Sequence, residues 1–83
     1  MPKYSHTFVE EYNGLVGFGL DRKTDEASFV VYLQKFSDDR LMAALKGRLT
    51  KPEIEEMVDL IHRLMRNHFC EEEYHRLFLK EDS

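Results

Sequence analysis

The residues with the richest chemistry lie near the C-terminus, where two histidines flank the single cysteine of the chain: His68, Cys70 and His75. Imidazole and thiolate groups are common zinc ligands, but a structural zinc site needs about four ligands that converge as a tetrahedron. The spacings here are two and five residues, and there is no second cysteine. These residues are therefore weak candidates for metal ligands, and we expect neither a metal site nor a cofactor.

The same cysteine and histidines could serve nucleophilic catalysis, in which a base accepts the thiol proton. Such a pair is defined by the distance between its atoms in the folded protein, so closeness in sequence does not establish it. The simpler interpretation is that Cys70 packs at the start of a helix and that the histidines lie on charged faces. We therefore predict that the protein is not an enzyme.

Three glycines, Gly14, Gly17 and Gly19, suggest a phosphate-binding loop at first sight. Their order is G-x-x-G-x-G, which reverses the dinucleotide-binding fingerprint, and that fingerprint must also open a helix. Glycine within a strand usually marks a place where another backbone or ring comes close. We therefore interpret these glycines as structural and expect no nucleotide there.

The overall composition is that of a small, acidic, globular protein of 83 residues with a formal net charge of −4. A chain of this length supports one small core, so we predict a single domain over residues 1–83 with a frayed tail over residues 80–83. A lone cysteine and the lack of a signal-peptide pattern favour a cytoplasmic location. No apolar run approaches the roughly 20 residues that span a bilayer, so we expect no contact with a membrane.

The first part of the chain has the composition of β-strands. Tyr4–Tyr12 and Ala27–Phe36 contain many β-branched and aromatic residues, and Asn13-Gly14 is a strong signal for a hairpin turn. Such a turn predicts a second strand over Leu15–Asp21 that pairs with both others. The sequence therefore predicts a three-stranded antiparallel meander.

From Ser37 onward the spacing of apolar residues becomes helical. Ser37 precedes two aspartates and predicts a helix start. Thr50 and Glu53 form a capping-box pattern that predicts a second helix, and Glu71 opens a third, short one. The apolar stripe of the second helix comprises Ile54, Met57, Val58, Ile61, Leu64 and Met65. The predicted fold is therefore α+β, a three-stranded meander followed by three α-helices packed on one face.

One face of this predicted sheet would carry apolar side chains with nothing to cover them. An uncovered apolar face usually marks an interaction site. The predicted partner-binding residues are Gly17, Gly19, Val30, Tyr32, Gln34 and Phe36. The leading hypothesis is therefore a protein-protein interaction module, acting as a regulator or inhibitor, whose partner is another protein or a second copy in a homodimer.

Two alternatives remain open. A nucleic-acid-binding regulator would use a locally positive stretch around the first two helices, although the negative net charge makes nucleic acid the less expected partner. The basic residues of that stretch are Arg40, Lys46, Arg48 and Lys51. The third possibility is a small metal-binding protein centred on the histidines and cysteine named above.

Overall fold

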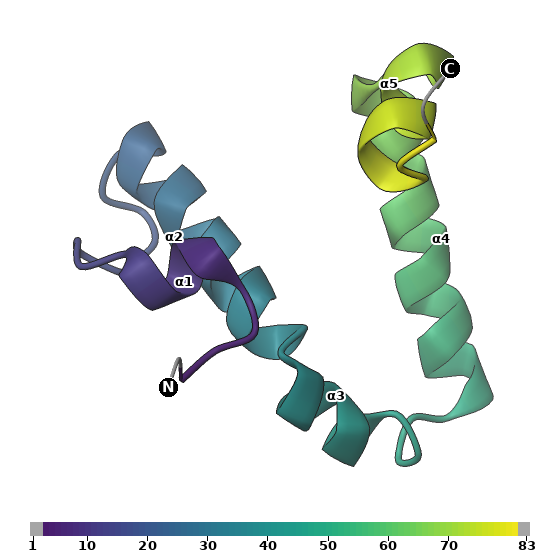
Figure 1. Ribbon diagram of the computed structural model, residues 1–83, viewed down its shortest axis with the longest axis horizontal. Helices are drawn as coiled ribbons and strands as arrows, with labels where there is room; N and C mark the ends of the chain where they lie inside the picture. Colours follow the sequence, from purple (N-terminus) through teal and green to yellow (C-terminus); the bar gives the residue numbers. More distant parts are fainter. Residues whose placement is uncertain (1–2, 82–83) are drawn as a thin grey trace. The chain divides into compact units, whose positions relative to one another are not determined.

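The computed structural model describes residues 3–81, and throughout that range the regular secondary structure is helical, with no strand (Figure 1). The chain divides into two compact units, the first ending at Arg48 and the second beginning at Leu49. We describe each unit separately. The predicted α+β fold is therefore wrong, because all three expected strands are replaced by helices and loops.

The largest correction concerns helix α2, which spans Arg22–Phe36 and contains the whole of the predicted third strand. Its first turn is well capped, because the Asp21 carboxylate accepts hydrogen bonds from the backbone N–H and the hydroxyl of Thr24 at 2.8 and 3.0 Å. Arg22 and Glu26 add an ion pair of 2.7 Å at i,i+4 spacing. These local interactions outweigh the strand preference of the β-branched and aromatic residues that follow.

The face that α2 buries explains why no helical period was visible. Ser28 and Val31 are buried and Thr24, Ala27 and Gln34 are half-buried, which is a helical i, i+3, i+4, i+7 stripe made mostly of small and polar residues. The large apolar side chains of α2 lie elsewhere and are exposed. They are Phe29, Tyr32, Leu33 and Phe36. The spacing of the large apolar residues therefore does not indicate which face of α2 is buried.

Helix α1 spans Thr7–Glu11 and lies against α2 (Figure 1). Val9 is buried, and its backbone N–H donates to the side-chain oxygen of Gln34 at 2.9 Å. The rings of Phe8 and Tyr12 stack with centroids 5.4 Å apart, one helical turn from each other. The predicted first strand is therefore a short helix that is fastened to α2.

The predicted hairpin turn does not form. A type I′ turn needs positive φ at both central residues, but among the described glycines only Gly19 has positive φ, at +87°. At Gly14 the Tyr12 ring folds back so closely that a Cβ would lie 2.6 Å from its hydroxyl oxygen. The Tyr12 hydroxyl donates to the carbonyl of Leu15 at 2.8 Å. Gly14 is thus needed for a close approach within a loop, and not for a hairpin.

The loop that replaces the second strand is tied to α2 by its own backbone. The N–H of Gly17 donates to the Ser28 hydroxyl oxygen, and the N–H of Gly19 donates to the Asp25 carboxylate, both at 2.9 Å. The Phe18 ring meets the edge of the Tyr32 ring with centroids 5.1 Å apart. The glycine-rich segment is therefore held by α2 side chains.

Helix α3 spans Asp39–Leu45 and confirms a helix in this region, with one change at its start. Its N-cap is Asp38, whose carboxylate accepts from the backbone N–H of Arg40 at 3.1 Å. Ser37 instead ends α2, where its N–H donates to the carbonyl of Leu33. The cap is thus displaced by one residue from the predicted position.

Helix α4 spans Lys51–His68 and confirms the second predicted helix. Both hydrogen bonds of the capping box are present: Thr50 N–H donates to the Glu53 carboxylate at 2.9 Å, and Glu53 N–H donates to the Thr50 hydroxyl at 3.3 Å. Pro52 lies in the first turn, where its missing N–H costs no helical hydrogen bond. The helix start is therefore fixed by local sequence alone.

After α4 the chain breaks at Phe69 and resumes as α5, Glu71–Glu73, followed directly by a π-helical turn, η1, over Tyr74–Phe78. The third predicted helix is thus present in a mixed form. Lys80, two residues after this turn, has φ +59°, and Glu81 folds back: its N–H donates to the His75 carbonyl at 3.0 Å, and its carboxylate lies 2.7 Å from His75 Nδ1. Of the predicted tail, residues 82–83 lie outside the described residues.

Within residues 3–81, no helix combines the length and the apolar character needed to cross a bilayer.

Candidate interaction surface

The main candidate site is the apolar face of α4, which we call the α4 stripe. Six of its side chains expose between 37% and 44% of their surface. They are Ile54, Met57, Val58, Leu60, Ile61 and Leu64. A seventh, Met65, is half-buried. An amphipathic helix normally buries such a face against another element, so the α4 stripe has the character of an unfilled contact surface.

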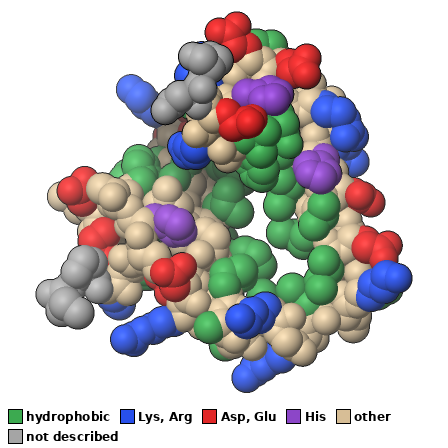
Figure 2. Space-filling view, turned by 45° about the vertical axis from the view of Figure 1, so that its right-hand side comes forward, with side chains coloured by type: hydrophobic (Ala, Val, Ile, Leu, Met, Phe, Trp, Pro, Cys, Tyr) green, Lys and Arg blue, Asp and Glu red, His purple; other side chains and the backbone are tan. Residues whose placement is uncertain are grey.

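The extent of this exposure stands out against the small core. Among the described residues, the buried apolar side chains are Val9 at 6% and Val31 at 3% exposure, both in the first unit. Hydrophobic side chains are accordingly visible across the surface in Figure 2. The second unit has no described residue that is fully buried. The described apolar side chains of this unit are therefore all at least partly exposed.

Charge on α4 is divided along the helix. The half that begins at Lys51 contains four carboxylates against this one lysine, a formal charge of −3. The half that ends at His68 contains two arginines and no acid, a formal charge of +2 with neutral histidines. The one ion pair between described α4 side chains joins Lys51 to Glu55 at 4.0 Å. The Glu53 carboxylate also accepts the capping-box hydrogen bond from Thr50.

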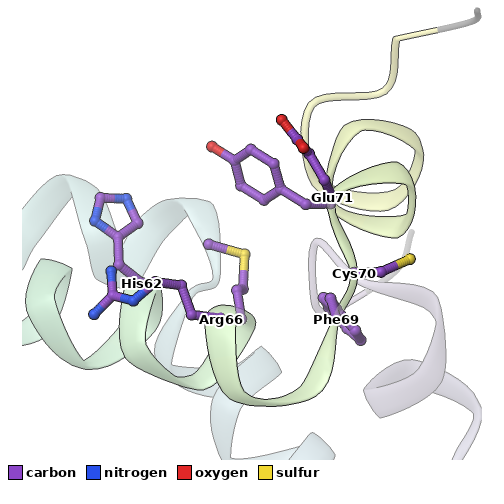
Figure 3. Close-up of a pocket in the computed structure, with 7 residues that line it drawn as sticks. His62, Arg66, Phe69, Cys70 and Glu71 are labelled. Atoms are coloured by element: carbon purple, nitrogen blue, oxygen red, sulfur yellow. The ribbon is translucent and has the colours of Figure 1, made fainter.

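A pocket of about 570 Å³ adjoins the C-terminal end of the α4 stripe (Figure 3). Its lining residues are His62, Met65, Arg66, Phe69, Cys70, Glu71 and Tyr74. His62 and Arg66 lie on α4, one turn apart, and Glu71 lies across from them after the chain break. The pocket therefore combines polar side chains, among them Arg66 and Glu71, with the apolar surfaces of Met65, Phe69 and Tyr74.

The weak metal candidates do not come together. Cys70 is exposed, and its sulfur points away from His62 (Figure 3). His68 is exposed at the end of α4, and His75 lies between Glu81 and, at 3.9 Å, Glu71. In the part of the chain that the structure describes, no group of three or more potential ligands could hold a metal ion. Neither does this arrangement pair Cys70 with the nearby His62 as nucleophile and base.

The predicted sheet-face residues are not on a common face. Gly17 and Gly19 lie in the loop before α2. On α2, Val30 and Gln34 lie one turn apart on the half-buried side, whereas Tyr32 and Phe36 lie on an exposed side. The residues that were predicted to form one binding surface thus lie on several different surfaces. In a strand every second side chain shares a face, whereas in a helix side chains share a face about every 3.6 residues.

The basic residues of the nucleic-acid alternative are all exposed. Arg40 lies in the first turn of α3, and Lys46 and Arg48 lie at and after its end. Lys51 belongs to the second unit and pairs with Glu55. Within the first unit these cations are therefore spread along and beyond one short helix.

Sequence reasoning missed a serine-histidine pair in the first unit. The Ser37 hydroxyl lies 3.0 Å from His6 Nε2, and the pair is partly buried. The distance would suit a nucleophile and its base, but neither residue lines the pocket at the end of α4. The pair attaches the N-terminal segment to the end of α2. With 31 residues between them, no local pattern could have indicated it.

A second polar cluster fixes the start of α3. The Asp38 carboxylate accepts from the N–H of Ser5 at 2.8 Å, and the Ser5 hydroxyl accepts from the N–H of Asp39 at 3.0 Å. The backbone hydrogen bond from Ser5 is the main reason that the pKa of Asp38 is lowered below its usual range. The ionised carboxylate is therefore the form that holds the N-terminal segment to α3.

This lowered pKa predicts a loss of order in acid. Because the folded pKa of Asp38 lies below the unfolded one, its stabilising contribution is complete above about pH 4 and is lost as the pH falls through the folded pKa. We expect the carboxyl carbon of Asp38, followed by NMR, to titrate at lower pH in the folded protein than in urea. Equal midpoints in the two states would contradict the cluster.

Comparison of the chain with known protein families, with curated proteins and with solved structures found no match. Function is therefore argued from the surfaces described above.

Proposed function

We propose that this protein is a noncatalytic protein-protein interaction module that binds its partner through the α4 stripe. One observation carries the proposal: the apolar face of α4 is exposed along the length of the helix, while the described core contains few buried apolar side chains. Contiguous exposed apolar surface of this kind marks an interaction site in a soluble domain. The corrected site is a helix face and not the predicted sheet face.

The chemistry of the stripe favours protein over nucleic acid. Its centre consists of aliphatic side chains, whereas phosphate backbones are bound through lysine and arginine. The net charge of −4 further disfavours a polyanion. A partner helix with its own apolar face is the natural complement of such a surface.

A photo-reactive amino acid placed at Ile61, in the middle of the stripe, tests this function. We expect it to yield a protein adduct under ultraviolet light in cells, because the partner surface would lie within contact distance. Arg63 is the matched control, since two residues along a helix place it on the polar side. Adducts formed equally at both positions, or formed only within the same chain, would overturn the proposal.

A further inference from the structure

We propose that the partner on the α4 stripe is a second copy of this chain, whose α4 lies antiparallel to the first. This inference rests on the proposed function, because it assigns the occupant of the same surface. Two independent properties of α4 carry it: the spacing of its apolar side chains and the division of its charge.

The spacing of the stripe is self-complementary in the antiparallel direction. Ile54, Met57, Ile61 and Leu64 recur at alternating intervals of three and four residues, as the seam positions of paired helices do. In an antiparallel pair, Ile54 lies opposite Leu64 of the second copy and Met57 lies opposite its Ile61. Each apolar layer then occurs twice, related by the twofold axis, as a closed dimer requires.

The α4 stripe is wider than the apolar seam of a simple two-helix coiled coil. Val58 and Leu60 extend the apolar surface on either side, and both are exposed. A wide apolar face suits broad contact with a partner element and leaves little room for flanking charge at the centre. The charged residues of α4 therefore act from its two ends.

Charge selects the antiparallel direction over the parallel one. In an antiparallel pair, Glu53 and Glu55 at the start of α4 lie beside the end of the second copy's α4, which carries Arg66. In a parallel pair, acids lie beside acids and arginines beside arginines, which disfavours that arrangement. The dipole of a single helix also favours acidic residues near its start and basic residues near its end. Antiparallel pairing places these two ends beside each other, so it adds to a charge distribution that is already favourable within one helix.

The pocket at the end of the stripe agrees with this arrangement. In the spacing that pairs Ile54 with Leu64, Lys51 of the second copy lies opposite Asn67, in the last turn of α4 before the pocket. Phe69 and Met65 supply apolar lining to the pocket. The pocket therefore lies at the edge of the proposed interface.

Spin labels measure the direction of pairing directly. We would attach them to purified full-length protein at Lys51→Cys or Asn67→Cys, in a Cys70→Ser background. Both sites are exposed and polar, and they lie at opposite ends of α4, about 24 Å apart along its axis at about 1.5 Å per residue.

An antiparallel dimer gives a distinctive pattern of distances. We expect a separation of roughly 24 Å or more between identical labels at either site, and a shorter one when chains labelled at Lys51→Cys are mixed with chains labelled at Asn67→Cys. A parallel dimer reverses this pattern and overturns the proposed direction. Equal circular dichroism of labelled and unlabelled protein checks that the helices are intact.

The outcomes also separate this inference from the proposed function. A monomeric mass by light scattering at the labelling concentration overturns the second copy as occupant. If photo-crosslinking at Ile61 then captures a different protein, the interaction module stands and only the homodimer fails. If crosslinking stays within one chain, the proposed function fails as well.

Discussion

Replacing Val31 with aspartate is expected to unfold the first unit. Val31 is 3% exposed, so the new carboxylate would be buried on the inner face of α2, whereas the side chain of Lys35, one turn later, lies at an exposed position. Burying an unpaired charge costs about 4 kcal/mol or more. That cost is comparable to the whole stability of a unit this small, which is about 5 kcal/mol or less. Circular dichroism should show a large loss of helix, and NMR should locate the loss before Arg48.

The matched control is Phe29→Asp on the same helix. Phe29 is 54% exposed, so a charge there keeps its water and should change the unfolding free energy by roughly 0.5 kcal/mol or less. If the two variants were equally stable in urea, Val31 would not be part of the core. If Phe29→Asp were the more damaging, the exposed face of α2 would have to be covered in solution.

Replacing Ile61 with aspartate should separate the proposed dimer into monomers. A twofold dimer contains the substitution twice, and each lost isoleucine contact is worth about 1.5 to 3 kcal/mol. The dissociation constant should therefore rise by roughly 10²- to 10⁴-fold. Sedimentation equilibrium over a concentration series measures this change.

Ile61→Leu is the control, because a volume-conserving apolar exchange is well tolerated. It should keep the dissociation constant within roughly tenfold of the unsubstituted protein, about 1.4 kcal/mol. A dimer that survives Ile61→Asp would place the interface away from the α4 stripe. Loss of the dimer in both variants would point instead to a general loss of folding.

The success of prediction differed sharply between the part of the chain before α3 and the helices that follow, for a physical reason. In α4 the capping box and the apolar period agree, so the local sequence was sufficient to predict a helix that begins after Thr50, where the structure has Lys51–His68. The exposure of its stripe could not be foreseen, because an amphipathic pattern shows which face is apolar and not what covers it. The sequence therefore predicted the element but assigned the binding surface elsewhere.

In α2 the same method failed because the buried face is polar. Ser28 and Gln34 are contact residues that an apolar count ignores, and the β-branched residues between them favoured a strand. Asn13-Gly14 then appeared to complete a hairpin, although Gly14 serves the Tyr12 ring. Contacts between residues far apart in the chain, such as His6 with Ser37, cannot be predicted from any local sequence pattern.

The hydrogen bonds that fasten α1 and its loop to α2 have a consequence for how this sequence can vary. Side chains of Asp25, Ser28 and Gln34 receive backbone N–H groups from elsewhere in the unit, so their hydrogen-bonding capacity must be kept. The large apolar residues on the opposite side meet no such requirement. The usual rule for a helix is thereby inverted in α2: relatives of this chain should preserve its small polar residues and Tyr32, whose ring packs against Phe18, and exchange Phe29, Leu33 and Phe36 more freely.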